Sequence, residues 1–425
     1  MGTVIIDEIA PGMTLAEDVY DRNGRFLLAK DLKLTSKHLR VLKIWGITAA
    51  KILNNAETAA HKHRETQIDP KVISKAAESI ANRFSHMDVE NGVEQELFRL
   101  CAIRQARMMS RGNRSLNKRD LKPSTPQSSE LTNNSCDWGQ SLESNKSAFA
   151  VLEKEIKLPA LPCIFYQIND AINNPRSSAR DIADIIKTDS SLSARLLRIA
   201  NSVLYGFRSK IDTISRAVVV IGTKEIGSLA LGITIMTQFN NIPSHIMDMK
   251  SFWKHNMACG IASRIIAGHK NIANLERLFI GGLLHDIGRL ILCKYLPDRL
   301  LASLQRAQSE DKFLYEVEPE TVGLKHSTIG ALLLKEWRLP VSLENIVKYH
   351  HQPLQAQDSL EPAIVNLADI IVNAAGIGSS GEQFVSPLDP EVWSYLDLPR
   401  SIFASTLKQV DRQVGELTRI FGNGV

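Results

Sequence analysis

Apolar residues recur every three to four positions along most of the second half of this chain, which is the spacing of one helix face. Polar residues and prolines divide the pattern into segments, and Ser177 or Ser178 followed by Asp181 is typical of a helix start. No regular alternation of strands and helices appears, so residues 148–425 are expected to form an all-helical domain. Helices are predicted at about 178–187, 190–201, 216–222, 224–240, 249–267, 275–295, 327–337, 342–351 and 362–374.

Residues 1–54 have a different pattern. Two β-prone runs, 15–20 and 25–29, flank Asn23-Gly24, which is a strong hairpin turn signal. A short capped helix is expected at about 37–45, before Gly46, and a third strand at 47–53. These residues are expected to form a small α+β unit that acts as an adaptor or in dimerisation, which leaves a homodimer open.

Residues 68–110 again have helical spacing, with Pro70 suited to a first helical turn. Residues 111–147 are rich in Ser, Asn, Lys, Pro and Thr and contain few apolar side chains, so they are predicted to be a disordered, flexible linker. A basic stripe lies across this boundary, but no aromatic residues alternate with it to stack on bases, so a nucleic-acid partner is not favoured. The stripe consists of Arg104, Arg107, Arg111, Arg114, Lys118, Arg119 and Lys122.

The composition is that of an ordinary globular protein, with 44% hydrophobic and 23% charged residues and a net charge of +5. Its 425 residues suffice for two or three domains. The five cysteines are scattered without a CxxC pair, which fits reduced thiols. Neither a signal peptide nor an apolar run of the roughly 18–20 residues that a membrane span needs is present. We therefore expect a cytoplasmic protein without a membrane partner.

Histidine and aspartate side chains are spread through the predicted helices. Asp286 follows the apolar run 280–284 and precedes another, so its carboxylate must be paired or bound to metal. Imidazole and carboxylate suit divalent first-row ions such as Fe or Mn, and seven ligands exceed what one ion usually takes. We expect one pocket that holds a divalent metal centre, with up to two ions. Its predicted ligands are His255, His285, Asp286, His326, His350, His351 and Asp369.

Some of these residues also have ordinary structural explanations. His255 shares a helix face with the small residues Ala258, Cys259 and Ala262, and a single inward histidine is more often a hydrogen-bonded core residue than a ligand. His326 stands at a helix start and can be a cap. The joint occurrence of all seven residues favours a metal site by about 3 to 1, from ligand type and number.

The order of these residues resembles the HD superfamily of metal-dependent phosphohydrolases. Further motifs follow in order over about residues 157–353. They are Leu158-Pro159-Ala160-Leu161-Pro162, Asp189-Ser190-Ser191-Leu192, Leu196-Leu197-Arg198-Ile199-Ala200-Asn201-Ser202, Ala217-Val218, Ile221-Gly222, Gly282-Leu283-Leu284-His285-Asp286-Ile287-Gly288, Trp337-Arg338-Leu339-Pro340 and His350-His351-Gln352-Pro353. This ordered set resembles HDOD domains, the HD-related output domains of bacterial signalling proteins. Through residues 11–16, residues 1–54 are similar to the unit that precedes some HD-GYP phosphodiesterases.

The resemblance implies a signalling module whose partner is a signalling protein or a nucleotide ligand. The chain departs from the cyclic-di-GMP phosphodiesterases in several features, among them Ser251 where those enzymes can place a glutamate and a gap of only eighteen residues before Asp369. Their Gly-Tyr-Pro motif is replaced by Gln352-Pro353-Leu354, and a lysine after His-Asp-x-Gly is replaced by Arg289. Arginine keeps a cation suited to phosphate, so Arg289 is expected to bind a ligand, without the geometry of lysine.

Two functions are therefore open. The first is a regulatory module, with or without bound metal, that does not hydrolyse cyclic-di-GMP efficiently. The second is a metal-dependent phosphohydrolase that acts on a nucleotide or cyclic dinucleotide, in which Asp286 bridges two ions that activate water. Metal content and turnover of cyclic dinucleotides would distinguish the two.

Overall fold

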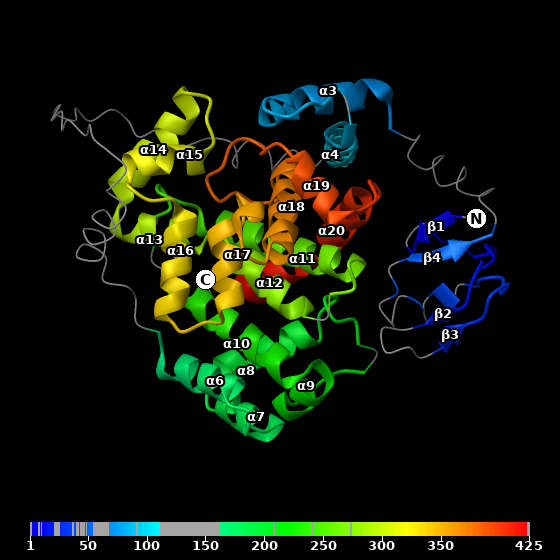
Figure 1. Ribbon diagram of the computed structural model, residues 1–425, viewed down its shortest axis with the longest axis horizontal. Coiled ribbons are helices and arrows are strands. Elements are labelled where there is room, and N and C mark those ends of the chain that lie inside the picture. Colours follow the sequence, from blue (N-terminus) through cyan, green and yellow to red (C-terminus); the bar gives the residue numbers. More distant parts are fainter. Residues whose placement is uncertain are drawn as a thin grey trace.

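The computed structural model is mainly helical, with a small strand-containing unit at the N-terminus (Figure 1). The mainly α fold class is thus confirmed for the residues that the structure describes. The predicted linker at 111–147 lies outside them. The described residues are 2–6, 9, 11–20, 26–35, 38–39, 42, 47, 49–53, 68–90, 92–110, 161–207, 209–239, 242–272 and 274–422.

The N-terminal unit contains two antiparallel strand pairs. β1 (Gly2–Ile5) pairs with β4 (Ala49–Ile52), and β2 (Val19–Tyr20) pairs with β3 (Phe26–Leu28). The predicted hairpin is confirmed in its strand pairing, while its turn lies outside the described residues. β1 is not among the predicted strands, although three of its four residues are β-branched. The unit has a core of its own, which includes Leu15, Leu34, Leu42 and Ile52.

The helical segment at 68–110 forms two helices. α3 (Pro70–Ala81) is capped by the Asp69 carboxylate, and a 3-10 turn, η1 (Asn82–Phe84), follows it. The chain then reverses before α4 (Gly92–Ser110), which packs against α3. Arg104 of α4 donates from Nε and Nη2 to the Asp411 carboxylate at 2.7–2.9 Å. The segment therefore packs on the C-terminal helices, and this member of the basic stripe is already paired.

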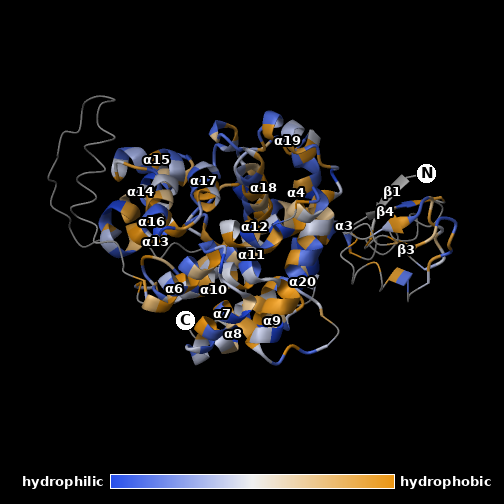
Figure 2. Cartoon of the chain, turned by 60° about the horizontal axis from the view of Figure 1, so that its bottom comes forward, coloured by the Kyte–Doolittle hydropathy of each residue, from blue (hydrophilic) through white to orange (hydrophobic). Residues whose placement is uncertain are grey.

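Most of the remaining helices pack around one hydrophobic core, which also includes residues of α3 and α4, whereas Leu314 and Val317 of α15 form a small cluster with Ala307 of α14. Hydrophobic and hydrophilic residues alternate along the outer helices (Figure 2). No single described helix is long and apolar enough to span a membrane, and α9 with α10 meets that test only as a pair bent by 119°. The helices are α6 (Cys163–Asn173), α7 (Ala179–Lys187), α8 (Ser190–Ala200), α9 (Ile214–Ile221), α10 (Thr223–Thr237), α11 (Met249–His269), α12 (Leu275–Leu284), α13 (Ile287–Tyr295), α14 (Pro297–Ser309), α15 (Leu314–Thr321), α16 (His326–Glu336), α17 (Val341–Tyr349), α18 (Leu360–Ala375), α19 (Pro390–Leu396) and α20 (Ile402–Gly422), with a 3-10 turn, η2 (Pro353–Gln355).

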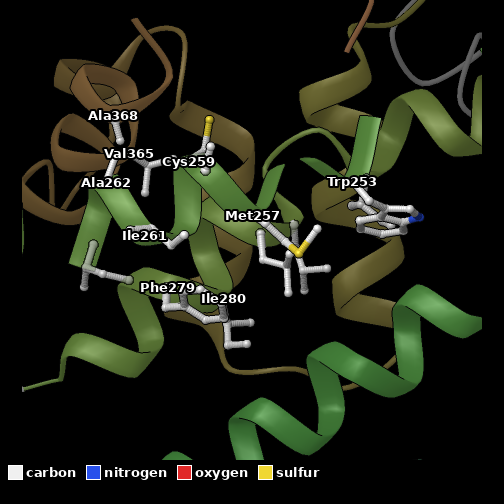
Figure 3. Packing of buried hydrophobic residues seen from close by; sticks show 14 of the residues in the cluster. Trp253, Met257, Cys259, Ile261, Ala262, Phe279, Ile280, Val365 and Ala368 are labelled. Carbon is white, nitrogen blue, oxygen red and sulfur yellow. The ribbon is translucent and has the colours of Figure 1, made fainter. Parts of the chain in front are cut away.

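α11 lies at the centre of the domain and contacts α12, α18 and α20. Glycines let α11 and α12 approach closely, because a Cβ on Gly260 would lie 2.6 Å from the Phe279 carbonyl oxygen. A Cβ on Gly282 would lie 2.7 Å from the backbone of Cys259. Figure 3 shows the apolar side chains of α11 packed against residues of α12 and α18. The crossing therefore brings His255 of α11 close to His285, which directly follows α12.

The predicted helix at 275–295 is broken. α12 ends at Leu284 and α13 begins at Ile287, so His285 and Asp286 occupy the turn between them. The break lets α13 run against α16, where Gly288 meets the His326 carbonyl and the backbone of Gly330. The expectation that His285 and Asp286 lie within one continuous helix is therefore wrong.

A substitution at the α13–α16 crossing tests this packing. A Cβ on Gly288 would lie 1.9 Å from the His326 carbonyl oxygen, so Gly288→Ala forces the helices apart. We expect it to lower the free energy of unfolding by about 3 kcal/mol or more. The control is Gly415→Ala in α20, where no atom lies within 4 Å of the added Cβ. That change should raise stability by about 0.5–1 kcal/mol, because alanine is the better helix former. Equal denaturation midpoints for the two variants would contradict the crossing.

Candidate metal centre

The structure brings all seven predicted residues together. His255 lies on α11, His285 and Asp286 lie in the α12–α13 turn, and His326 begins α16. The His350-His351 pair follows α17, and Asp369 lies in α18. Six of the seven are buried, and only His351 is partly exposed. Elements from residue 249 to residue 375 thus contribute to one cluster in the interior of the helical domain.

Asp286 lies at the middle of the cluster, and its two oxygens face different neighbours. Oδ2 lies 3.2 Å from His285 Nε2 and 3.9 Å from His255 Nε2. Oδ1 lies 3.0 Å from His326 Nε2 and 3.9 Å from His350 Nε2. One carboxylate with imidazoles on either side is the arrangement that bridges the ions of a two-metal site.

The first group of candidate ligands consists of His255, Cys259, His285 and Asp369. Asp369 Oδ1 lies 3.1 Å from His255 Nε2 and 3.5 Å from His285 Nε2. Cys259 Sγ lies 3.5 Å from His255 Nε2 and 3.7 Å from Asp369 Oδ1. Cys259 was not among the predicted ligands, although it follows His255 by four residues and so shares its helix face.

The second group consists of Asp286, His326, His350 and His351. His326 Nε2 lies 3.4 Å from His350 Nε2 and 3.2 Å from His351 Nε2. Three ring nitrogens therefore approach one carboxylate oxygen of Asp286. A cation between them would remove the repulsion of their lone pairs, so the group fits a divalent ion.

Hydrogen bonds at the outer ring nitrogens fix the orientation of three histidines. His285 Nδ1 lies 2.8 Å from the Gly282 carbonyl oxygen, and His350 Nδ1 lies 2.7 Å from that of Val347. A carbonyl oxygen only accepts, so both Nδ1 atoms carry the proton and a neutral ring directs its Nε2 lone pair inward. His285 Nε2 and Asp286 Oδ1 are buried without a hydrogen-bond partner. These orphaned atoms support the fit of the site to metal.

Glu318 of α15 has the same role for His326. Its carboxylate is fully buried and accepts from the His326 backbone N–H at 2.8 Å and from Nδ1 at 2.7 Å. A carboxylate behind a ligating histidine fixes the ring and increases its basicity. Sequence reasoning missed Glu318, because nothing in the local pattern around Pro319 distinguishes it from neighbouring glutamates.

The charges of the cluster also suit a bound cation. Burial, together with the neighbouring His285 and His326, lowers the pKa of His350 to about 3, so this ring is neutral and can donate its lone pair. Burial alone would lower the pKa of His285, but the Asp286 carboxylate raises it to about 10. A metal ion would take the place of that proton as the counter-charge. Burial opposes ionisation of Asp286, yet Arg289 and His285 hold its pKa well below the usual range.

Arg289, the predicted ligand-binding residue, is 1% exposed. Its Nη1 donates to the Ser380 carbonyl and hydroxyl oxygens, both at 2.9 Å. Its Nε lies 3.3 Å from Asp286 Oδ1, and Nη2 lies 3.8 Å from Glu382 Oε2. A phosphate would have to displace these groups of the protein to reach the guanidinium.

The outer side of the cluster is covered by protein. Tyr315 of α15 stacks on His351, with ring centroids 4.2 Å apart and planes 16° apart. The segment after α18 closes another side, since Ser379 N–H donates to the Ser251 carbonyl at 3.3 Å. In the described part of the chain, cavities of about 480 Å³ and 20 Å³ lie elsewhere, lined by none of the seven residues. The arrangement can hold ions, but it offers them little contact with solvent.

Comparisons with known proteins agree with the fold. Residues 158–353 match the family model of the HDOD domain. A curated relative, an uncharacterized protein of Treponema pallidum (strain Nichols), is 25% identical over 229 residues, which is 53% of this chain and only 44% of that protein.

Solved structures share the fold at low sequence identity. An HDOD domain protein of unknown function from Geobacter sulfurreducens superimposes with a TM-score of 0.55 at 21% identity, over 66% of this chain and 97% of that one. A "putative phosphohydrolase" from Shewanella amazonensis SB2B gives 0.52 at 22%, over 65% and 98%. A "putative signal transduction protein" from Marinobacter aquaeolei VT8 gives 0.53 at 18%, over 66% and 64%. At these identities the likeness shows the fold alone.

Glu318→Gln tests the orientation of His326. The amide cannot match a carboxylate as acceptor for both His326 donors, so we expect the affinity of the second group for a divalent ion to fall about 10- to 100-fold. Competition with a chromogenic chelator measures this. Glu316→Gln, on the exposed side of the same helix, is the matched control and should leave the affinity unchanged. Equal affinities for the two variants would contradict the role given to Glu318.

Proposed function

Because residues 158–353 are an HDOD domain, we propose that this chain is a signal-transduction protein whose output domain holds a dinuclear metal centre and does not hydrolyse cyclic-di-GMP efficiently. Its ligands are the seven residues of the cluster, with Asp286 as the bridge. Iron, manganese or a similar divalent ion suits imidazole and carboxylate ligands. The name of the Marinobacter neighbour supports the signalling role.

The burial of the centre carries this proposal. His255, His285, His326 and His350 have no exposed surface, and Asp286 has 2%. Hydrolysis of a diester requires the phosphorus to lie in line with an activated water beside the ions. A dinucleotide could not reach the ions without displacing Tyr315 or the segment around Ser380. The geometry therefore favours a structural or regulatory centre.

The chain after His350-His351 supports the same conclusion. η2 (Pro353–Gln355) stands where the catalytic relatives have their Gly-Tyr-Pro motif, and α18 begins at Leu360. Asn366 Nδ2 of α18 donates to the His350 carbonyl at 2.7 Å, which ties the two elements together. This leaves little space for a substrate loop. Arg289 likewise faces inward, toward Asp286 rather than toward a ligand.

The N-terminal unit suits contact with a partner. Tyr20 and Phe26 are 49% and 53% exposed and lie edge to face, with centroids 5.8 Å apart. Exposed aromatic side chains are enriched at protein interfaces. As an adaptor, this unit would connect the helical domain to a signalling protein. As a dimerisation unit, it would connect two copies of this chain.

A metal-dependent phosphohydrolase is the second candidate. The full ligand set and the bridging position of Asp286 support it, because a two-metal site can activate water and stabilise a phosphoryl group. The name of the Shewanella neighbour is consistent with it. The bound ions alone do not distinguish this function from the first, so turnover must be measured.

The test is metal content followed by turnover. Protein purified without chelator should contain close to two divalent ions per chain. Asp286→Ala should lose the ion of the second group and bind the other more weakly, because it removes the bridge. The metal-loaded protein should convert cyclic-di-GMP far more slowly than roughly 1 per second, the lower range of ordinary enzymes. Asp298→Ala, at an exposed position in the first turn of α14, is the matched control and should keep both ions.

Either of two results would overturn the proposal. Absence of bound metal after loading would remove the centre itself. Turnover at an ordinary rate that is lost in Asp286→Ala and kept in Asp298→Ala would establish the phosphohydrolase instead.

A further inference from the structure

We propose that the Cys259 thiolate is a metal ligand, so that the first group is a closed site of two imidazoles, a thiolate and a carboxylate that prefers zinc. This inference rests on the metal centre proposed above and goes further, because it makes the two ion positions chemically different. The second group, which Asp286 shares with three histidines, contains no sulfur. The thiolate is outside the set of seven His and Asp residues predicted from the sequence.

Four of the six distances between ligand atoms of the first group are close to those around a tetrahedral ion. Zinc lies about 2.3 Å from thiolate sulfur and about 2.0–2.1 Å from imidazole nitrogen, so neighbouring ligand atoms in a tetrahedron are separated by about 3.3–3.6 Å. Cys259 Sγ lies 3.5 Å from His255 Nε2 and 3.7 Å from Asp369 Oδ1. Asp369 Oδ1 lies 3.1 Å and 3.5 Å from the two imidazole nitrogens. All four ligand atoms lie within 4.8 Å of one another.

The position of Cys259 on α11 directs its sulfur to the ion. It follows His255 by one helical turn, and the close approach of Gly282 fixes its backbone. Figure 3 shows Cys259 beside Val365 and Ala368 of α18, the helix that also carries Asp369. A cysteine that served only as a small apolar residue would not need its sulfur next to an imidazole and a carboxylate. The contact with Asp369 is too long to be more than a weak S–H hydrogen bond.

The ligand types determine what each position can do. Thiolate is a soft ligand that favours zinc, whereas imidazole with carboxylate and no sulfur accommodates iron or manganese. Four protein ligands suffice for a zinc site, and the bridging Asp286 oxygen, 3.2 Å from His285 Nε2, takes any further position. No position is then open to water, which is the mark of a structural site. The first position would therefore stabilise the packing of α11, α12 and α18. Only the second, next to partly exposed His351, could exchange an ion or bind a small ligand.

The experiment uses full-length protein loaded with Zn²⁺ or with Co²⁺ as a spectroscopic probe. X-ray absorption at the zinc edge should detect about one sulfur per chain at about 2.3 Å. The cobalt form should show a near-ultraviolet thiolate-to-metal charge-transfer band. In Cys259→Ala the band and the sulfur shell should disappear, and zinc affinity at this position should fall by more than about 10-fold. The ion of the second group should remain.

Cys293→Ala is the matched control, because Cys293 is also a buried thiol but has Met247 as its sulfur's neighbour, 3.9 Å away. It should keep the band, the sulfur shell and both ions. The absorption measurement on the unsubstituted protein needs no variant, so it decides the question even if Cys259→Ala does not fold. Two bound ions with only nitrogen and oxygen neighbours would overturn the thiolate assignment and leave the metal centre intact. Absence of any bound ion would overturn both.

Discussion

The burial of two carboxylates is the constraint on which the helical domain depends. Asp286 and Asp369 lie within an apolar core, where an unpaired charge would cost far more than the few kcal/mol by which domains are stable. The His255 and His326 imidazoles lie 3.1 and 3.0 Å from Asp369 and Asp286, and the Arg289 guanidinium supplies positive charge 3.3 Å from Asp286. The helices that contribute ligands must therefore end beside these carboxylates or pass next to them.

Glycines make that convergence sterically feasible. At the α11–α12 crossing, Gly260 and Gly282 allow backbone contact that any side chain would prevent. At the α13–α16 crossing, Gly288 and Gly330 do the same for the helices that follow Asp286 and begin with His326. The glycines, which have no functional side chain, thus determine the distances between the candidate metal ligands. If these helices were as far apart as helices without glycine at the crossing, the ligand atoms would lie too far from one another to bind the same ions.

Most of the helices and all seven candidate ligands could be predicted from the sequence, because they have local signals. Features that depend on tertiary packing could not. Helices such as α7 have local capping and periodicity, and Asp286 and Asp369 stand out because charge in an apolar run demands a partner. The break at His285 and Asp286 has no local signal, since it results from the packing of α13 on α16. Glu318 and Cys259 act through tertiary contacts. Glu318 looks like any other glutamate, and Cys259 looks like a small core residue, until the fold places His326 and Asp369 beside them.

Contacts of η1 and α4 with the end of α18 join the segment before the HDOD match to a helix that follows it. Arg83 donates to the Ala374 carbonyl at 3.1 Å, and Arg104 donates to that of Ala375 at 2.6 Å, so two guanidinium groups from the first quarter of the chain satisfy the last carbonyls of the helix that carries Asp369. The stretch that matches the HDOD family, 158–353, includes neither α4 nor α18. A fragment of residues 158–353 would keep six of the seven candidate ligands but would lose Asp369 with the whole of α18. It would also lose Arg83 and Arg104, which donate to the last carbonyls of α18. The stretch that matches the family is therefore smaller than the unit that packs around one hydrophobic core.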